Sequence, residues 1–160
     1  MRRLFALLAT LLVLVVVAQF YLAASAAFDT APNDESFQTH RALGYGIVLF
    51  AIVLTIVAAL ARMPGRLIGM TGLVVGLAVG QGLIRAIAAA FNDTGDTSTT
   101  AGKLVFGLHA VDGLIILAVA ETVARRARAL SRPMVAGRPA GPGGGAGAFG
   151  PAAGPAHPAS

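Results

Sequence analysis

The chain alternates between four long apolar stretches and short polar breaks. Nearly continuous runs of Leu, Val, Ile, Ala and Gly occupy residues 4–24, 42–61, 67–90 and 104–124. Each run is long enough for a helix that crosses a hydrocarbon core, which needs about 20 residues. The runs do not show the segments of about ten residues with alternating polarity that are typical of membrane barrels. The pattern therefore predicts an all-α fold, a four-helix transmembrane bundle.

The same pattern divides the chain into a transmembrane domain, residues 1–130, and a C-terminal segment, residues 131–160. From Pro133 onward the sequence is dominated by Pro, Gly and Ala, with a glycine run at 143–145. A segment of this composition cannot bury an apolar core, so we expect a disordered cytoplasmic tail. His157 in that tail is expected to be solvated and not to act as a ligand.

Composition supports lipid as the solvent and restricts the chemistry. Hydrophobic residues make up 56% of the chain and charged residues 12%, and the mean hydropathy is +0.78. Soluble domains carry about 25% charged residues. The absence of cysteine excludes disulfides, Cys-ligated zinc, iron–sulfur clusters and thiol catalysis. Histidine is then the soft metal ligand that remains.

The basic residues are distributed unevenly between the polar breaks. Those before the first run, between the second and third, and after the fourth are Arg2, Arg3, Arg62, Arg66, Arg125, Arg126, Arg128, Arg132 and Arg138. The other breaks hold most of the acids. The positive-inside rule then predicts that both termini lie on the cytoplasmic side of the membrane. The expected location is the cell membrane, as a multi-pass protein of the bacterial inner membrane. The sequence pI of 11.1 reflects this topology, so the lipid bilayer is expected as a partner and nucleic acid is not.

The N-terminus also has features of a secretory signal. Arg2 and Arg3 precede an apolar run that ends in Ala24-Ser25-Ala26, which fits an A-x-A cleavage site. The run is longer than the usual signal core of about 7–15 residues, and it carries Gln19, which a packed helix tolerates better. An uncleaved first helix is favoured, and cleavage stays open as the alternative.

Two histidines lie near the outer ends of the second and fourth apolar runs. We expect Asn33 or Asp34 to be the N-cap of the second helix, which places His40 one to two turns into it. His109 follows Leu104 by five residues, which corresponds to about 7–8 Å of helix. Because both helices run in the same direction, the two imidazoles are predicted to lie at similar depth and could face each other.

A glycine follows each histidine after four residues. Gly44 and Gly113 are therefore predicted one helical turn inward of His40 and His109, on nearly the same face. The missing side chains would leave space for a flat macrocycle between two axial imidazoles, so the sequence suggests a b-type heme. Structural histidines that form hydrogen bonds within the bundle, and a proton relay, stay open as alternatives.

The spacing also indicates an internal duplication, in which the first two helices resemble the last two. Gln19 and Gln81 occupy matching places in the outer parts of the first and third runs.

Two further charged residues lie inside the apolar runs. Arg85 is expected near the depth of the histidines, where its guanidinium could bind a heme propionate, with Arg41 adding positive charge at the rim. An ion pair between Arg85 and Asp112 would explain both residues equally well. Asp112 could instead orient the His109 imidazole by hydrogen bonding.

The run from His40 to Gly44 resembles the His-Arg-x-Leu-Gly element of the heme A synthase family. Members of that family have two pseudo-symmetric four-helix bundles with histidines near the outer ends of helices two and four. The resemblance implies axial-ligand roles for His40 and His109. The family has a glutamate one turn before the first histidine, where this chain has Phe37, so heme A synthesis is not expected.

A second resemblance extends to about Arg126. The chain is similar to an uncharacterised family of small actinobacterial four-helix membrane proteins, through residues 19–23, the His40 motif and residues 108–113. This resemblance implies the fold and no activity.

These observations favour an integral membrane protein that binds one heme b and serves in electron transfer or heme handling, and they give no reason to expect an enzyme. Two axial histidines leave no open iron position for oxygen chemistry. One site in the outer half of the membrane would need a quinone, a redox subunit or a homo-oligomer partner to move electrons across it. The alternatives are a non-catalytic membrane subunit or scaffold, and a small transporter or proton pathway.

Overall fold

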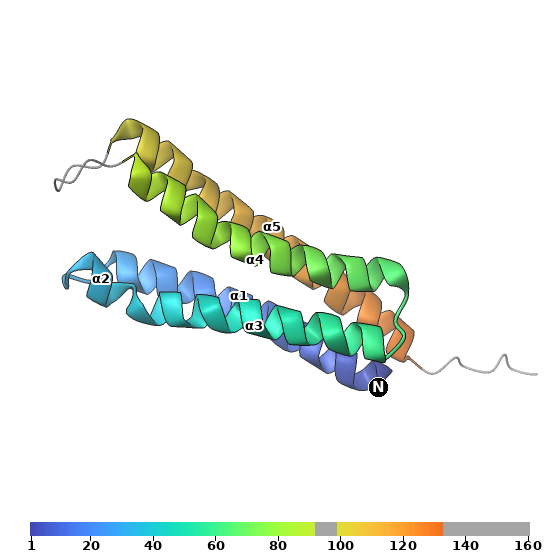
Figure 1. Ribbon diagram of the computed structural model, residues 1–160. Helices are drawn as coiled ribbons and strands as arrows, with labels where there is room; N and C mark the ends of the chain where they lie inside the picture. The colour runs from blue at the N-terminus through green and yellow to red at the C-terminus, as the bar shows by residue number, and fades with distance from the viewer. Residues whose placement is uncertain (92–98, 133–160) are drawn as a thin grey trace, which may run out of the picture.

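A computed structural model describes residues 1–91 and 99–132 (Figure 1). Its helices are α1 (Arg2–Ala27), α2 (Asn33–Ser36), α3 (Gln38–Leu60), α4 (Gly65–Ala90) and α5 (Thr100–Ser131). These ranges contain no strand, and the four longer helices are long and apolar enough to cross a membrane. The prediction of an all-α, four-helix transmembrane fold is confirmed. The tail expected from Pro133 onward lies outside the described residues.

The four long helices form a ring. α1 packs beside α3 and α5, and α4 packs beside the same two helices. α3 and α5 therefore face each other across the bundle. In Figure 1 the ribbons of the α1/α3 pair and of the α4/α5 pair come together toward the N-terminus and separate toward α2. We refer to the end with the N-terminus, the α3–α4 turn and the last turns of α5 as the arginine end, and to the opposite end as the histidine end.

The interior of the bundle is built from small and branched apolar side chains. They recur every three or four residues, so one stripe of each helix faces inward. The stripes are Phe5, Ala9, Leu12 and Val16 on α1; Ile47, Ala51, Leu54 and Ala58 on α3; Leu67, Val74 and Ala78 on α4; and Ile116, Ala120, Val123 and Ala127 on α5. This core occupies the middle of the bundle and its arginine end.

The outward faces of the helices are also apolar. Leu7 and Leu14 of α1 and Leu49 of α3 are each at least 60% exposed. A water-soluble bundle would place charged residues at such positions. In a membrane, exposed leucines are solvated by the acyl chains of the lipid. The exposed faces therefore fit a multi-pass membrane protein, as the hydropathy pattern predicts.

Most helices extend beyond the apolar runs that predicted them. α5 begins at Thr100, where the Thr99 hydroxyl caps the helix by accepting a hydrogen bond from the Gly102 amide at 3.0 Å. It continues through the basic residues to Ser131, whose hydroxyl donates to the Arg2 carbonyl at 3.1 Å. The helices continue through polar residues at their ends, because the backbone hydrogen bonds of a helix form whether the side chains are apolar or polar.

The turn between α3 and α4 is tight and uses an unusual residue. The amides of Arg62 and Met63 donate to the carbonyls of Ala59 and Ala58 at the end of α3, each at 3.0 Å. This is the Schellman pattern, which requires a left-handed residue that is usually glycine. Arg62 takes that role here with φ 49°.

The start of the second long helix differs from the prediction. The chain forms the short helix α2 at Asn33–Ser36, turns at Phe37 and only then begins α3 at Gln38. The amides of Glu35 and Ser36 both donate to the Pro32 carbonyl, so α2 is a separate turn closed on that residue. His40 is consequently the third residue of α3 and not one to two turns into a continuous helix.

Candidate functional site: a paired Gln–His layer

The two histidines meet across the bundle near its histidine end. The ring centroids of His40 on α3 and His109 on α5 are 6.3 Å apart, and the ring planes are inclined by 54°. Both side chains are half-buried. α3 and α5 are the diagonal helices of the ring, so this pair bridges the two helix pairs at the level where the dry core ends.

His40 is held by Gln19 of α1 through hydrogen bonds in both directions. The Gln19 side-chain amide Nε2 donates to the His40 carbonyl at 2.8 Å, and His40 Nδ1 lies 3.2 Å from the Gln19 carbonyl. The same Gln19 Nε2 lies 3.4 Å from His40 Nε2. Oε1 of Gln19 is buried and has no hydrogen-bond partner among the described residues. The result is a reciprocal clamp between α1 and α3.

His109 is held by Gln81 of α4 in the same manner. Gln81 Nε2 donates to the His109 carbonyl at 2.9 Å, and His109 Nδ1 lies 3.4 Å from the Gln81 carbonyl. The two clamps therefore join α1 to α3 and α4 to α5 by equivalent atoms. This equivalence fits the internal duplication that the sequence suggests.

The clamps determine which ring nitrogen carries the proton. A carbonyl oxygen can only accept, so Nδ1 of His40 and Nδ1 of His109 must each act as the donor. In the neutral imidazole this leaves the lone pair on Nε2 of both rings. Metal-binding histidines commonly show this arrangement, with the distal nitrogen free to coordinate and the other donating to a backbone carbonyl.

Two phenylalanines support the imidazoles. Phe37 lies edge-on to His40 with ring centroids 5.9 Å apart, and Phe106 stacks on His109 at 5.2 Å with an interplanar angle of 7°. Hydropathy and residue spacing did not assign these two residues to the site. A signal was nevertheless present, because a phenylalanine precedes each histidine by three residues and lies one helical turn away.

The glycines after the histidines do not border open space. A Cβ on Gly44 would lie 3.2 Å from Gln19 Nε2, and a Cβ on Gly113 would lie 3.2 Å from Phe20 Cζ and 3.7 Å from Gln81 Nε2. Both glycines thus make room for side chains of the neighbouring helices. The expectation that they open a gap for a macrocycle is not met, because Gln19 occupies that space at Gly44, and Phe20 together with Gln81 occupies it at Gly113.

Asp112 is part of the second clamp. Its Oδ2 accepts a hydrogen bond from Gln81 Nε2 at 2.8 Å. Within the described residues it forms no ion pair with Arg85, and no hydrogen bond joins it to the His109 ring. In the first clamp the equivalent position, three residues after His40, is Leu43. The carboxylate therefore breaks the symmetry of the two clamps.

The two arginines expected at the rim occupy different environments. Arg85 is exposed and lies one helical turn beyond Gln81 on α4, toward the histidine end. Arg41 directly follows His40 and is half-buried. Both are on the same side of the core as the imidazoles.

Comparison with known proteins supplies no activity. The model of a family described as "Family of unknown function (DUF6220)" matches residues 19–93. The match begins at Gln19, includes His40 and Gln81, and ends before α5. No curated protein and no solved structure matches the chain. This segment is therefore similar to an uncharacterised family, and the function has to be argued from the site.

Proposed function

We propose that this membrane protein binds one b-type heme through His40 and His109 and serves in electron transfer or heme handling. The observation that carries the proposal is that both imidazoles donate from Nδ1 to a backbone carbonyl of the preceding long helix. This leaves an Nε2 lone pair on each of two facing rings, and the long contact of 3.4 Å between His40 Nε2 and the Gln19 amide nitrogen is one that heme ligation would replace.

The donor set favours an iron porphyrin over a bare metal ion. Within the described residues there is no group of three or more His, Cys, Asp and Glu side chains able to hold a metal ion. Protein zinc sites use three or four such ligands. A heme brings four nitrogen ligands of its own and takes only one or two from the protein. Two imidazoles fall within the number of protein ligands that this cofactor takes.

The spacing of the imidazoles is compatible with axial ligation. A metal–nitrogen bond to histidine is about 2 Å, so the centroids of two imidazoles on opposite sides of one iron lie about 6 Å apart. The observed separation is 6.3 Å.

The remaining residues would position the cofactor. The carbonyls of Gln19 and Gln81 hold the imidazoles in one tautomer and orientation. Arg85 and Arg41 would pair with the propionates at the rim. The heme would supply one-electron redox chemistry. With His40 and His109 both engaged as its protein ligands, a bound heme would offer no free site for oxygen chemistry, so the proposal favours a role in electron or heme transfer.

The position of the site determines what else electron transfer requires. His109 and Arg126 lie on one helix and are separated by about 25 Å along it. A heme at the histidine level would therefore lie toward one face of a hydrocarbon core that is about 30 Å thick. A quinone, a redox subunit or a second copy of the chain would have to carry electrons across the remaining distance.

Spectroscopy of the purified protein tests the proposal. The full chain is expressed with heme supplementation and purified in detergent, and dithionite-reduced and oxidised spectra are recorded. We expect a b-type difference band with about one heme per chain, and we expect it to be lost in His40→Ala and in His109→Ala. The matched control is His157→Ala, which removes a histidine outside the four apolar runs of the sequence and should leave the band unchanged.

Two results would contradict the proposal. Absence of any reduced-minus-oxidised band in the folded wild-type protein would show that it binds no heme. A band that persists in both histidine variants would show that the ligands are elsewhere. Circular dichroism of each variant establishes whether the helices are intact, so that loss of heme is not confused with loss of fold.

A second candidate is a non-catalytic membrane subunit in which the histidines are structural. The reciprocal hydrogen bonds favour it, because each imidazole already has a partner and each clamp joins two helices without a cofactor. Under this interpretation His40→Ala and His109→Ala lower the thermal stability of a colourless protein. Under the heme proposal the same variants also abolish an absorption band.

A further inference from the structure

A carboxylate lies beside one of the two imidazoles and has no equivalent beside the other. Asp112 follows His109 by three residues, which is about 4.5 Å along α5, and its side chain is half-buried. Oδ2 of Asp112 accepts a hydrogen bond from Gln81 Nε2 at 2.8 Å, and the same nitrogen donates to the His109 carbonyl at 2.9 Å. The shared donor therefore holds the carboxylate at a defined place next to His109.

No basic side chain neutralises this carboxylate. In the part of the chain that the structure describes, Asp112 forms no ion pair. Arg85 lies one helical turn beyond Gln81 on α4, but it is exposed, so water and salt screen its charge. The contact that Asp112 makes is with a neutral amide. Its negative charge is thus left to act on the neighbouring groups of the histidine layer.

The other acids near the histidine layer are more strongly screened. The remaining acidic side chains that the structure describes at the histidine end are Asp29 and Glu35, and both are exposed. The interaction between two charges is weakened by water and strengthened where the surroundings have a lower dielectric constant. Among these described acids, half-buried Asp112 is therefore the one whose charge acts most strongly on the imidazoles.

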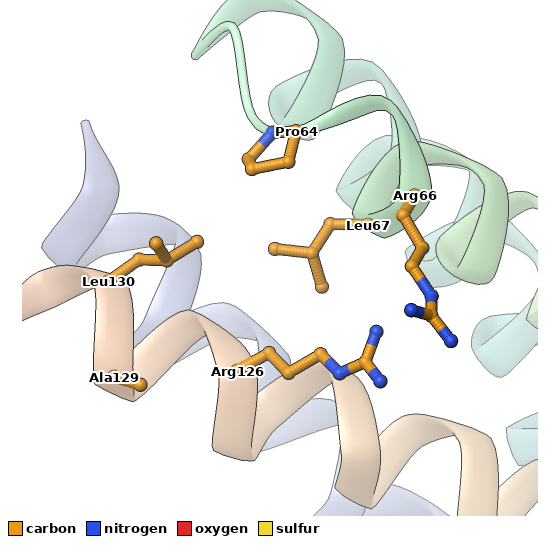
Figure 2. Close-up of a pocket in the computed structure, with 6 residues that line it drawn as sticks. All are labelled: Pro64, Arg66, Leu67, Arg126, Ala129 and Leu130. Atoms are coloured by element: carbon orange, nitrogen blue, oxygen red, sulfur yellow. The ribbon is translucent and has the colours of Figure 1, made fainter.

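The guanidiniums at the arginine end are too distant to offset this charge. Arg66 and Arg126 line an apolar hollow between the start of α4 and the last turns of α5 (Figure 2). Arg126 follows Asp112 by 14 residues, which corresponds to about 21 Å of helix. Because a Coulomb interaction weakens with distance, a carboxylate one turn from His109 outweighs cations at the opposite end of the bundle.

The hydrogen bond to Gln81 does not by itself explain why this residue is charged. An asparagine would present a similar oxygen acceptor and would cost less to remove from water. In the first clamp Gln19 holds His40 without a carboxylate, and Leu43 occupies the equivalent position. Ionisable residues within membrane helices are costly and usually serve a function. The charge of Asp112 is therefore the feature that needs an explanation.

We propose that Asp112 lowers the reduction potential of the heme held by His40 and His109, an inference that rests on the proposed function. Reduction adds one electron to the site, and a nearby negative charge opposes this addition by Coulomb repulsion. Burial and the groups around the ligands are among the means by which a protein sets a heme potential. Asp112 does not ligate the cofactor. It acts through its charge, in the position that Gln81 gives it.

Potentiometric titration of the heme-loaded full chain in detergent tests this inference. Asp112→Asn removes the charge and keeps an acceptor for Gln81, so we expect the midpoint potential to rise while the absorption bands keep their positions. Asp112→Glu retains the charge and should stay near the wild-type midpoint. Leu43→Asp places a carboxylate at the equivalent position after His40, so we expect it to lower the midpoint.

Glu35→Gln is the matched control, because it removes an exposed acid at the same end of the bundle. It should leave the midpoint nearly unchanged. An unchanged or lowered midpoint in Asp112→Asn would overturn the inference. An equal rise in Glu35→Gln would show an effect of net charge alone, and a rise accompanied by displaced absorption bands would show altered ligation. Each of these results also overturns it.

Leu43→Asp covers the case in which Asp112→Asn does not fold or does not bind heme. This variant leaves the second clamp intact, so a lowered midpoint supports the action of a carboxylate at this level, and an unchanged midpoint contradicts it. The two proposals fail in different ways. A wild-type protein without a heme band contradicts the proposed function, whereas a heme-loaded protein whose midpoint ignores both substitutions contradicts only the role of Asp112.

Discussion

The Gln81 side-chain amide donates a hydrogen bond of 2.8 Å to Oδ2 of Asp112. The same nitrogen donates to the His109 carbonyl at 2.9 Å, so one amide serves two acceptors on α5. In the other clamp Gln19 donates to the His40 carbonyl, but Leu43 stands where the carboxylate would be. The two clamps are therefore alike in backbone contacts and unequal in side-chain charge.

This asymmetry predicts unequal effects of removing the glutamines. Gln19→Leu loses one hydrogen bond to a carbonyl and a long contact of 3.4 Å with His40 Nε2, and we expect a loss of about 1 kcal/mol of unfolding free energy. Gln81→Leu also leaves the Asp112 carboxylate without its donor, so we expect a larger loss, about 2 kcal/mol. Equilibrium unfolding of the detergent-solubilised protein, followed by circular dichroism, measures both.

The chain offers a matched control in Gln38, which is exposed at the start of α3. Gln38→Leu should leave stability nearly unchanged. Equal losses for Gln19→Leu and Gln81→Leu would show that the Asp112 contact contributes nothing. The double variant Gln81→Leu/Asp112→Leu should recover part of the loss, because it removes the unpaired carboxylate together with its donor.

Glycine substitutions distinguish close contacts from open helix faces. A Cβ at Gly44 would lie 3.2 Å from Gln19 Nε2, and a Cβ at Gly113 the same distance from Phe20 Cζ. The rigid ring gives way less easily than the amide. We therefore expect Gly113→Ala to cost about 2 kcal/mol and Gly44→Ala about 1 kcal/mol.

Gly46 and Gly107 are the matched controls, because nothing lies within 4 Å of a Cβ at either position. Alanine there should be neutral or should stabilise the helices by up to about 1 kcal/mol, the difference in helix propensity. Thermal unfolding monitored by circular dichroism compares the four variants. A destabilised Gly46→Ala protein combined with an unaffected Gly44→Ala protein would refute the contact at Gln19.

Arg62 holds a left-handed conformation with φ 49° at the end of α3. A residue with a Cβ loses about 1 kcal/mol or more in this conformation, whereas glycine does not. Arg62→Gly should therefore raise the unfolding free energy by up to about 1 kcal/mol, and Arg62→Val should lower it because a β-branched residue tolerates positive φ poorly. Unfolding midpoints test both, and a stabilised Arg62→Val protein would contradict the turn geometry.

The charge distribution predicts the orientation of the bundle in the membrane. A reporter fused after Arg132 is expected on the cytoplasmic side, because the arginines of the arginine end are retained there. A reporter placed after Asp29, between α1 and α2, should lie on the opposite side. Alkaline phosphatase and green fluorescent protein fusions in a bacterial host measure this. The reverse pattern would place the histidine end, with His40 and His109, on the cytoplasmic side of the membrane.

The sequence was sufficient for the helices and insufficient for the details of the site. Length and hydropathy decide the number of long helices, because lipid requires each segment to satisfy its own backbone hydrogen bonds. They do not decide where α3 begins. The break at Phe37 is recorded in the backbone hydrogen bonds, where the amides of Glu35 and Ser36 donate to the Pro32 carbonyl and that of Arg41 donates to the Phe37 carbonyl, and a hydropathy pattern does not contain this information.

The importance of His40 and His109 followed from their rarity among apolar residues, and their similar depth followed from helix geometry. Which atoms they use depends on the tertiary structure. Only the packing of α1 against α3, and of α4 against α5, brings the carbonyls of Gln19 and Gln81 to the two Nδ1 atoms. Those contacts select the tautomer, because a carbonyl can accept a hydrogen bond but cannot donate one.

The sequence by itself determined a multi-pass, all-helical membrane protein with one end rich in arginine and two histidines near the other. The tertiary structure alone decided that Gly44 and Gly113 accommodate neighbouring side chains and that Asp112 pairs with Gln81. It also decided that Arg66 and Arg126 share one hollow. The reason is physical: solvation by lipid depends on each segment separately, whereas contacts between helices depend on the rotation and spacing of their partners.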